Sequence, residues 1–328
     1  MTDDGLVIRP ATAADRGAIV ALLATSLGRD PRDARFDALF SWKHETNAFG
    51  PSPMWVACDG DALAGFRTLM RWRFERDAST VDAVRAVDTA THPDYQGRGI
   101  FTRLTLHALD ALRDEGVGFV FNTPNDQSRP GYLKMRWRVV GRVPVAVRPR
   151  TPAGLLRMAR SRTAADRWSA PCDVGEPASA VTARTAELRE LLASQPRSRG
   201  LRTARSPEFL AWRYGGDLLP YRCVVAPGGV REGVVFLRRR ARGAARETVV
   251  ADVLARGGDR RLAHALVRRA AREAGGEYAI RVAEPGPVAG GFVRLPRQGP
   301  ILTWRDVCDR SMPPPGEWHV SLGDIELF

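Results

Sequence analysis

The chain has 328 residues, a net charge of +13 and 44% hydrophobic residues. This length allows two domains, each with a core of its own. The sequence has no run of about 20 apolar residues, so we expect no membrane-spanning helix and no membrane partner. Its acidic start, with Asp3 and Asp4, lacks the basic and apolar leader of a secreted protein, so we expect a cytoplasmic protein.

Cysteine and histidine residues give no sign of a metal site. The four cysteines are scattered and the five histidines do not cluster, so we expect reduced thiols and no bound metal. Only Lys43 and Lys134 are lysines, a bias towards arginine that is typical of a GC-rich coding sequence. The arginine runs at 238–240 and 268–269 lack aromatic residues that stack on bases. A solvated basic surface is therefore favoured over a nucleic-acid site, which the net charge alone does not exclude.

The start of the chain predicts an alternation of strands and helices. Thr12 and Asp15 have the spacing of a capping box, in which Asp takes the place of Glu. The expected elements are, in chain order, a strand at 6–9, a helix with apolar residues from Ile19 to Leu27, a helix at 33–44, and a hairpin of strands 54–57 and 62–69.

The most informative segment joins a predicted strand at 84–91 to a predicted helix that ends at Gly116. Its sequence is Gln96-Gly97-Arg98-Gly99-Ile100-Phe101. Glycines let the backbone turn tightly and direct several N–H groups to one point. The first helical turn adds unpaired N–H groups and the positive end of the helix dipole. The segment therefore predicts a diphosphate site, to which the side chain of Arg98 adds charge.

Two motifs carry a resemblance to a known family. The segment 96–101 resembles the Q/R-x-x-G-x-G/A signature with which the GNAT N-acetyltransferases bind acetyl-CoA. Further on, Asn125 and Tyr132 have the spacing of the family's N-x-x-A-x-x-x-Y-x-K-x-G-F segment, with Ser128 in the alanine position. The two motifs occur in the family's order, and the resemblance covers residues 1 to about 147.

Three residues depart from the family pattern. Phe101 replaces a small residue, Arg136 replaces glycine and Trp137 replaces phenylalanine. Phe101 keeps its backbone N–H, so we expect it to change the packing more than phosphate binding. Arg136 leaves the path of the last turn open.

The resemblance implies an α/β (α+β) fold, in which a mixed, mostly antiparallel central sheet is flanked by helices. Residues 40–44 and the hairpin after them resemble 210–214 and the hairpin that follows, so the second half repeats the plan of the first. We expect tandem GNAT folds, with a catalytic domain at 1–147, a linker with one short helix at 148–182 and a degenerate GNAT-like domain at 183–328. In the second copy Asp259 offers a carboxylate where a diphosphate would lie, which like charge disfavours.

The resemblance also implies roles for single residues. The backbone of Ala90 and Thr91 would pair with the pantetheine arm of acetyl-CoA, and Asn125 would bond its amides from the other side of the cleft. Tyr132 matches the family tyrosine that protonates the departing thiolate. The full set of predicted cofactor-binding residues is Ala90, Thr91, Gln96, Gly97, Arg98, Gly99, Ile100, Phe101, Asn125 and Ser128.

The general base has several candidates. Asp88 lies on the strand before the predicted diphosphate site, where a carboxylate could take the amine proton directly or through water. Asp252 occupies the equivalent place in the second copy, which needs no base, and this favours a structural role for Asp88. His44 and Glu45 are the other candidate pair, with a capping or solvated role as the alternative.

Together these features predict an acyl-CoA-dependent N-acyltransferase. It would transfer acetyl from acetyl-CoA, as cosubstrate, to a primary amine of a small molecule or sugar. One alternative is a Fem-like aminoacyl transferase, which also pairs two GNAT-like domains and draws on tRNA. Another is a non-catalytic acyl-CoA-binding or scaffold protein. The acceptor, the acyl length and the oligomeric state stay open.

The last segment, residues 318–328, is apolar up to its final position. We expect it to dock as a strand and to bring its carboxyl groups to the junction between the domains.

Overall fold

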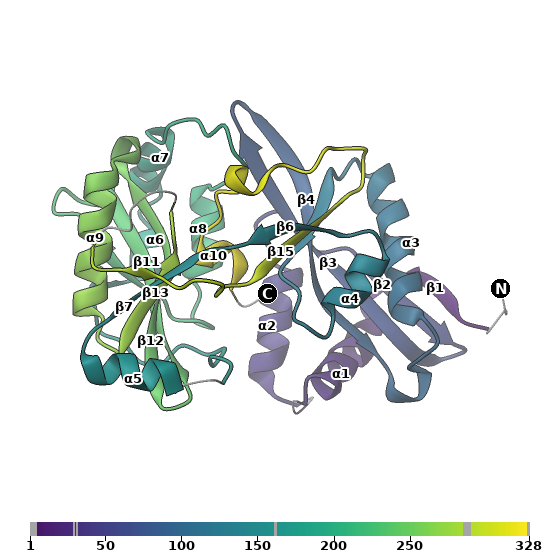
Figure 1. Cartoon of the computed structure of the whole chain (residues 1–328). Helices are drawn as coiled ribbons and strands as arrows, with labels where there is room; N and C mark the ends of the chain where they lie inside the picture. The colour runs from purple at the N-terminus through teal and green to yellow at the C-terminus, as the bar shows by residue number, and fades with distance from the viewer. Residues whose placement is uncertain (1–4, 29, 31, 161–162, 285–289, 327–328) are drawn as a thin grey trace.

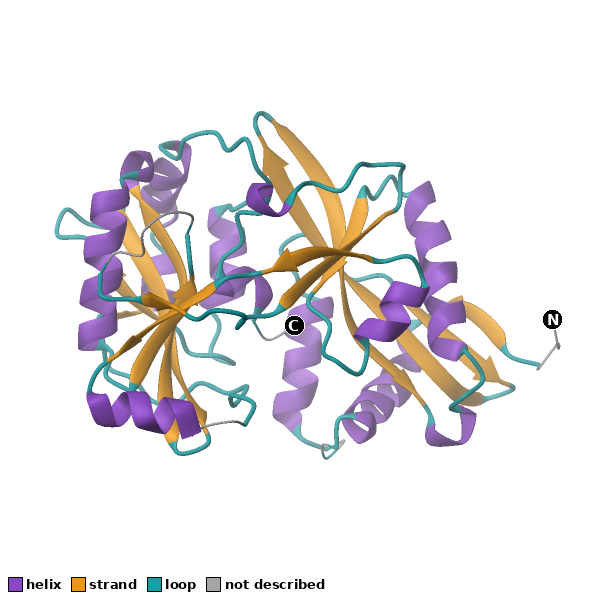
Figure 2. Cartoon of the chain, viewed as in Figure 1, coloured by secondary structure: helices purple, strands orange, loops and turns teal. Residues whose placement is uncertain are grey.

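The computed structural model describes residues 5–28, 30, 32–160, 163–284 and 290–326. Two sheets lie next to each other, each flanked by helices (Figure 1; Figure 2). Neighbouring strands are antiparallel except for one parallel pair in each sheet. The predicted α/β (α+β) class with mixed, mostly antiparallel sheets is therefore confirmed.

The first sheet has the strand order β1-β2-β3-β4-β5-β15-β6, with β9 beside β3. The β3–β4 hairpin is longer than the sequence indicated, because its outer half packs against the second sheet's helices and is apolar on that face. The strands are β1 (Val7–Pro10), β2 (Met54–Asp59), β3 (Ala62–Arg76), β4 (Ser79–Thr91), β5 (Phe119–Asn122), β6 (Arg138–Arg142), β9 (Arg202–Thr203) and β15 (Ile301–Asp306).

Helices cover both faces of this sheet. α1 (Arg16–Ser26) and α2 (Ala34–His44) pack on one face, and α3 (Ile100–Asp114) and α4 (Arg129–Lys134) lie on the other. The capping box of Thr12 and Asp15 is present, in the short 3-10 helix η1 (Ala13–Asp15) before α1. Gly65 lets α3 approach β3 closely, since a Cβ there would lie 2.5 Å from Ile100 Cγ2.

The second sheet has the strand order β14-β7-β13-β12-β11-β10-β8. α9 (Arg260–Glu273) covers one face, and the short helices of the second half cover the other. The strands are β7 (Val145–Pro149), β8 (Glu176–Pro177), β10 (Arg222–Val225), β11 (Gly233–Arg242), β12 (Ala245–Ala255), β13 (Tyr278–Val282) and β14 (Val293–Arg294). The helices are α5 (Pro152–Arg160), α6 (Ala178–Thr182), α7 (Thr185–Ala193), α8 (Pro207–Tyr214) and α10 (Leu322–Ile325), with 3-10 helices η2 (Pro93–Tyr95), η3 (Arg256–Gly258) and η4 (Pro315–Glu317).

The two halves of the chain exchange a strand. β7 follows β6 in the sequence but pairs with β13 in the second sheet, whereas β15 lies between β5 and β6 in the first (Figure 1). The expected division after residue 147 therefore falls inside β7, and the range 183–328 contains two strands of the first sheet, β9 and β15. Residues 148–182, expected to be a linker with one short helix, carry α5, β8 and α6.

α2 and α8 meet at the junction of the two sheets through a pair of tryptophans. The rings of Trp42 and Trp212 stack with centroids 5.1 Å apart. Each indole N–H donates to the backbone carbonyl oxygen of the other tryptophan, at 2.7 and 2.8 Å. The contact is reciprocal, as an isologous contact between two copies of one unit is. The similarity of 40–44 to 210–214 thus has a structural counterpart.

The tail docks at this junction as the helix α10, so the expectation of a strand is wrong. A capping box of Ser321 and Asp324 starts the helix. Arg85 donates to the carbonyl oxygens of Asp324 and Ile325. Gly323 lies so close to Tyr214 that a Cβ would be 1.9 Å from its hydroxyl oxygen. Residues 327–328, to which the tail prediction extended, lie outside the described residues.

Glu326 ends the described tail in a buried cluster of arginines. Its carboxylate accepts from Arg238 Nε at 3.1 Å and from the Tyr221 hydroxyl at 2.7 Å. Burial raises the pKa of Glu326, but the charges of Arg238, Arg240 and Arg213 outweigh burial and lower the pKa to about 2. The carboxylate therefore stabilises the fold above its ordinary pKa, and this contribution is lost as the pH falls from that value towards about 2.

We expect Glu326→Gln to lower the free energy of unfolding at pH 7 by about 3 kcal/mol, because it leaves buried arginine charges without a partner. The deficit relative to the unaltered chain shrinks as the pH falls towards 2, where the native carboxylate protonates as well. Urea unfolding at several pH values measures the loss of unfolding free energy at pH 7 and its decrease at lower pH. Glu273→Gln, which breaks an exposed pair with Arg269, is the control. Equal stability of the two variants at pH 7 would contradict the assignment.

Candidate functional site

The loop before α3 leaves the start of that helix open. Gly97 and Gly99 adopt φ of +80° and +71°, a region that favours glycine. Gly99 is the residue that precedes the helix, and no side chain caps it. Residues 96–99 are exposed. The first N–H groups of α3, which have no partner within a helix, therefore face an accessible position with the positive end of the dipole.

Arg98 lies beside this opening. Its guanidinium sits over the ring of Tyr95, 4.9 Å from the centroid, and the Tyr95 hydroxyl donates to Asp59 at 3.1 Å. A stacked guanidinium keeps its N–H edge free for a planar or tetrahedral anion. The six residues predicted to hold a diphosphate thus lie together at one helix start.

The equivalent helix of the second half has its start occupied. Asp259 precedes α9, and its Oδ1 accepts from the backbone N–H groups of Arg261 and Leu262, at 2.8 and 3.2 Å. The carboxylate takes the place that an anion would need, and its charge would repel one. Of the two copies, only the first has an uncapped helix at this junction.

Beside the loop, β4 separates from β5. The parallel pairing covers residues 83–85 and 119–121 and stops there, although β4 continues to Thr91. On its other side β4 stays paired with β3, where Ala90 lies opposite Phe66 and Thr91 opposite Gly65. Within the described residues, the β5 side of Ala90 and Thr91 has no strand beside it. Such an open edge can pair with an extended ligand.

Asp88 lies at an irregularity in the pairing of β3 with β4. The register shifts so that Val87 and Asp88 together lie opposite Thr68. The Asp88 side chain reaches α2, where it forms an ion pair with Lys43 and a hydrogen bond with His44 Nε2 at 2.9 Å.

His44 links Asp88 to the loop before β2. A carboxylate only accepts, so His44 Nε2 donates to Asp88, and Nδ1, 3.0 Å from Ser52 Oγ, accepts from the Ser52 hydroxyl. Burial lowers the pKa of His44, which keeps the ring neutral. Burial raises the pKa of Asp88, but Lys43 and His44 outweigh it and hold the pKa well below its ordinary value. A carboxylate held in this way is a weak proton acceptor.

The second copy repeats this arrangement. Tyr214, at the position of His44, donates to Asp252 at 3.3 Å, and Arg205 pairs with the same carboxylate at 2.6 Å. A shared contact in both copies favours a structural role for Asp88, which ties a helix end to the sheet. Its role as general base stays a prediction. Glu45, the other candidate beside His44, pairs with Arg16 at 2.6 Å.

Tyr132 lies on α4 and is buried. Its ring packs against Phe101 and Trp137, with centroids 5.4 and 5.1 Å away. Phe101 thus forms part of the packing around the tyrosine. The phenol oxygen lies 3.0 Å from Nη1 of Arg67, a fully buried arginine of β3. The sequence reasoning missed Arg67, although a charged residue inside an apolar strand was a signal.

Asn125 and Ser128 shape the start of α4. Asn125 Oδ1 accepts from the backbone N–H and the hydroxyl of Ser128, at 2.8 and 2.9 Å. The carboxamide oxygen of Asn125, a residue predicted to bond the cofactor's amides, therefore holds this turn. Arg136 ends the segment with φ of +67°, a backbone region that favours glycine, the residue of the family pattern at this position.

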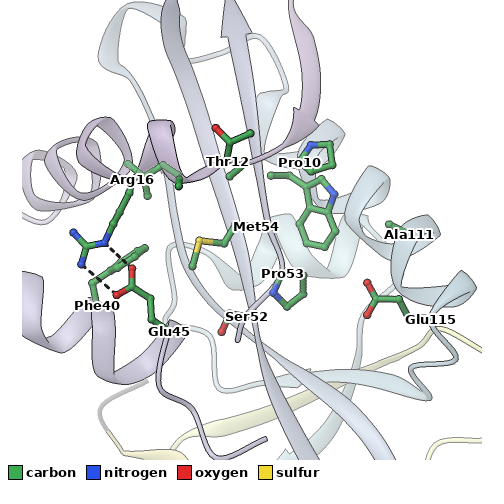
Figure 3. A pocket seen from close by; sticks show the side chains of 14 residues that line it. Pro10, Thr12, Arg16, Phe40, Glu45, Ser52, Pro53, Met54, Ala111 and Glu115 are labelled. Carbon is green, nitrogen blue, oxygen red and sulfur yellow. Dashed lines mark hydrogen bonds and ion pairs between the residues drawn. The ribbon is translucent and has the colours of Figure 1, made fainter. Parts of the chain in front are cut away.

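A cavity of about 510 Å³ lies where β1 and β2 meet α1, α2 and the end of α3 (Figure 3). Arg16 and Glu45 pair on one side of it, and Glu115 lies on the other. Ser52 also lines the cavity. It is hydrogen-bonded to His44, which is in turn hydrogen-bonded to Asp88. Its lining, within the described structure, includes no residue predicted to bind the cofactor.

The described residues lack two other kinds of site. In the part of the chain that the structure describes, no helix is both long and apolar enough to cross a membrane. Among the same residues, no group of three or more His, Cys, Asp or Glu side chains is placed to hold a metal ion.

Comparison with known sequences identifies the first half. Residues 7–140 match the sequence model of a family described as "Acetyltransferase (GNAT) domain". The match contains the loop before α3, the open edge of β4 and Tyr132. No curated protein matches the chain.

Solved structures share the fold of both halves. A protein from Enterococcus faecalis V583, titled a conserved protein of unknown function and probable N-acyltransferase, is 11% identical with a TM-score of 0.65; the similarity covers 92% of this chain and 73% of that one. A GCN5-related N-acetyltransferase from Anabaena variabilis is 13% identical, with a TM-score of 0.62 and the same coverage. Eis1 from Mycobacterium abscessus is 16% identical, with a TM-score of 0.56 and coverage of 92% and 74%. At these identities the likeness shows the fold alone.

We expect Arg136→Gly to raise the free energy of unfolding by about 0.5–1 kcal/mol. A positive φ costs a non-glycine residue about 1–2 kcal/mol, which exceeds the extra entropy that glycine loses on folding. Arg136→Ala is the matched control, because it removes the charge but keeps the Cβ and the strain. Thermal unfolding compares the three proteins. If alanine stabilises as much as glycine, the charge and not the backbone is responsible.

Proposed function

We propose that the chain, whose residues 7–140 match a GNAT acetyltransferase domain, is an acyltransferase that transfers acetyl from acetyl-CoA to a primary amine of a small molecule or sugar. The observation that carries the proposal is the uncapped start of α3 next to the open edge of β4. A diphosphate fits the first feature, and an extended arm with amide groups fits the second.

The chain's residues fit acetyl-CoA as a substrate in three places. The amides of Gly97 to Phe101 would bind the diphosphate, with Arg98 beside it. The backbone of Ala90 and Thr91 would pair with the pantetheine arm. Gln96, Ile100, Asn125 and Ser128 complete the proposed contacts or hold the loops that make them. The buried side chain of Ile100 fixes α3 on the sheet, so its contribution is through the backbone N–H.

The proposed reaction is a direct attack by the neutral amine on the thioester carbonyl. A C–N bond forms, the C–S bond breaks, and the electron pair leaves with the sulfur. Holding both reactants together supplies much of the rate. Tyr132 would give its hydroxyl proton to the leaving thiolate, while the amine nitrogen loses a proton to a base or to water. Asp88 is the proposed base, and its ion pair with Lys43 favours a path through water over direct contact.

The second domain is proposed to support the first and to border the acceptor. Its capped α9 argues against a second cofactor site. The acceptor is proposed to be small, and no binding of nucleic acid or membrane is proposed.

A carboxylate like that of Asp259, which caps α9, can be introduced at the start of α3. Gly99→Asp places a carboxylate at the helix start, and aspartate tolerates positive φ better than most residues. We expect CoA binding, measured by calorimetry, to weaken about tenfold or more through like-charge repulsion. Gly99→Asn is the isosteric neutral control. Its affinity for CoA should lie within about threefold of that of the unaltered chain, a loss of less than about 1 kcal/mol of binding free energy. Equal affinity of the two variants for CoA would contradict the proposed diphosphate site.

The second prediction concerns the proton donor. Tyr132→Phe should lower kcat for acyl transfer by about 100-fold or more, because the leaving thiolate loses its acid. The heat of CoA binding should be the same as in the unaltered chain, since the backbone amides at 97–101 are unchanged. Release of free thiol during turnover, with a panel of small amines, measures the rate. A rate equal to that of the unaltered chain would remove Tyr132 from the mechanism.

A further inference from the structure

Arg67 is a fully buried cation next to the proposed acid. It lies on β3 with 0% of its surface exposed. Its Nη1 donates to the phenol oxygen of Tyr132 at 3.0 Å and to the carbonyl oxygen of Val87 at 3.2 Å. Val87 belongs to the irregular part of β4, beyond the last pair with β5. Arg67 thus joins the tyrosine to the place where the two strands separate.

No carboxylate pairs with Arg67 among the described residues, and its Nε and Nη2 are buried without a hydrogen-bond partner. Two other arginines, the largely buried Arg205 and the fully buried Arg238, have such a partner. Arg205 pairs with Asp252 at 2.6 Å, and Arg238 pairs with Glu326 at 3.1 Å. The rings of Phe101 and Tyr132 lie 5.6 and 5.5 Å from the Arg67 guanidinium carbon and compensate its charge only in part.

An uncompensated buried cation is costly, because the protein interior solvates charge poorly. It becomes favourable when a negative charge forms beside it. In the proposed reaction, a negative charge forms on the sulfur and, after proton transfer, on the phenol oxygen of Tyr132. The Arg67 donor lies at hydrogen-bond distance from that oxygen before the reaction begins, so no group has to move to meet the charge.

The direction of the hydrogen bond matters as well. A guanidinium only donates, so the phenol oxygen accepts from Arg67 and its own proton must point elsewhere. Because its oxygen accepts from Arg67 Nη1, the hydroxyl proton points away from the guanidinium. The hydroxyl is therefore oriented as a donor to a group on its other side.

We propose that Arg67 is the positioning residue for Tyr132: it orients the phenol as a proton donor and stabilises the phenolate that remains after the proton has passed to the sulfur. The inference rests on the proposed role of Tyr132. The proton balance is complete, because the phenolate regains a proton from the one that the amine nitrogen releases. The alternative is that Arg67 only fastens α4 to the sheet.

The test uses Arg67→Met, which keeps an unbranched apolar side chain in place of the aliphatic part of arginine and removes the charge and the donors. We expect kcat to fall about 100-fold, the size of losing one preorganised donor, with KM for acetyl-CoA within about twofold. The basic limb of the kcat–pH profile should move to higher pH, because the phenolate loses its stabilising charge. Arg67→Lys, which restores a cation, should recover part of kcat. Arg73→Met removes an exposed arginine of the same strand, paired with Asp82, and should leave kcat unchanged.

A double variant separates the two roles of Arg67. In a Tyr132→Phe background, Arg67→Met should lower kcat no further, because the group that it serves is gone. If the two losses multiply, or if Arg67→Met keeps kcat and the pH profile, the proposed role is wrong. If Arg67→Met does not fold, Arg67→Lys decides: a kcat no higher than that of Tyr132→Phe would overturn the proposal.

A measurement that needs no turnover distinguishes this inference from the proposed function. Tyrosine labelled with carbon-13 at Cζ gives one resonance that is absent from Tyr132→Phe. The chemical shift of that resonance should change in Arg67→Met, because the phenol oxygen no longer accepts a hydrogen bond from a guanidinium. An unchanged chemical shift in a folded variant would overturn the role of Arg67 even if Tyr132 proves essential. A changed chemical shift in a protein without acyl transfer would instead leave Arg67 in place and overturn the proposed reaction.

Discussion

The uncapped start of α3 is the constraint on which this account depends. Two glycines at positive φ turn the chain away from the helix, so no side chain reaches its first N–H groups. The same turn brings the helix onto β3 beside Gly65, where the end of β4 stands free of β5. An anion site and an open strand edge therefore come from one local backbone geometry. The second copy shows the contrast, because Asp259 caps α9 and its carboxylate excludes an anion.

The rest of the molecule holds this geometry in place. The exchange of β7 and β15 ties each sheet to the other half of the chain, so the halves share a core that runs from Trp72 to the docked tail. Trp42 and Trp212 form a reciprocal contact, and Asp88 fastens α2 to the first sheet as Asp252 fastens α8 to the second. These repeated contacts explain why an acidic residue occurs in both copies. They also favour a structural role for this acidic residue in each copy.

Local patterns in the sequence predicted local structure well. The spacing of glycines at 97 and 99 predicted a turn into a helix, and the likeness of 40–44 to 210–214 predicted a repeat, because both depend on neighbouring residues. The strand exchange could not be predicted, since the apolar pattern of β7 is the same in either sheet. The tail was expected as a strand, but the capping box at Ser321 starts a helix. Arg67 was missed because its importance comes from Tyr132, which is 65 residues away and meets it only in the folded chain.

Hydrogen–deuterium exchange with and without CoA tests the central claim most directly, because it reports on the backbone amides themselves. The account predicts that CoA slows exchange in peptides covering 90–104, while peptides covering 256–265, at the capped start of α9, keep their exchange rates. Protection confined to other segments, or equal protection at both helix starts, would contradict it.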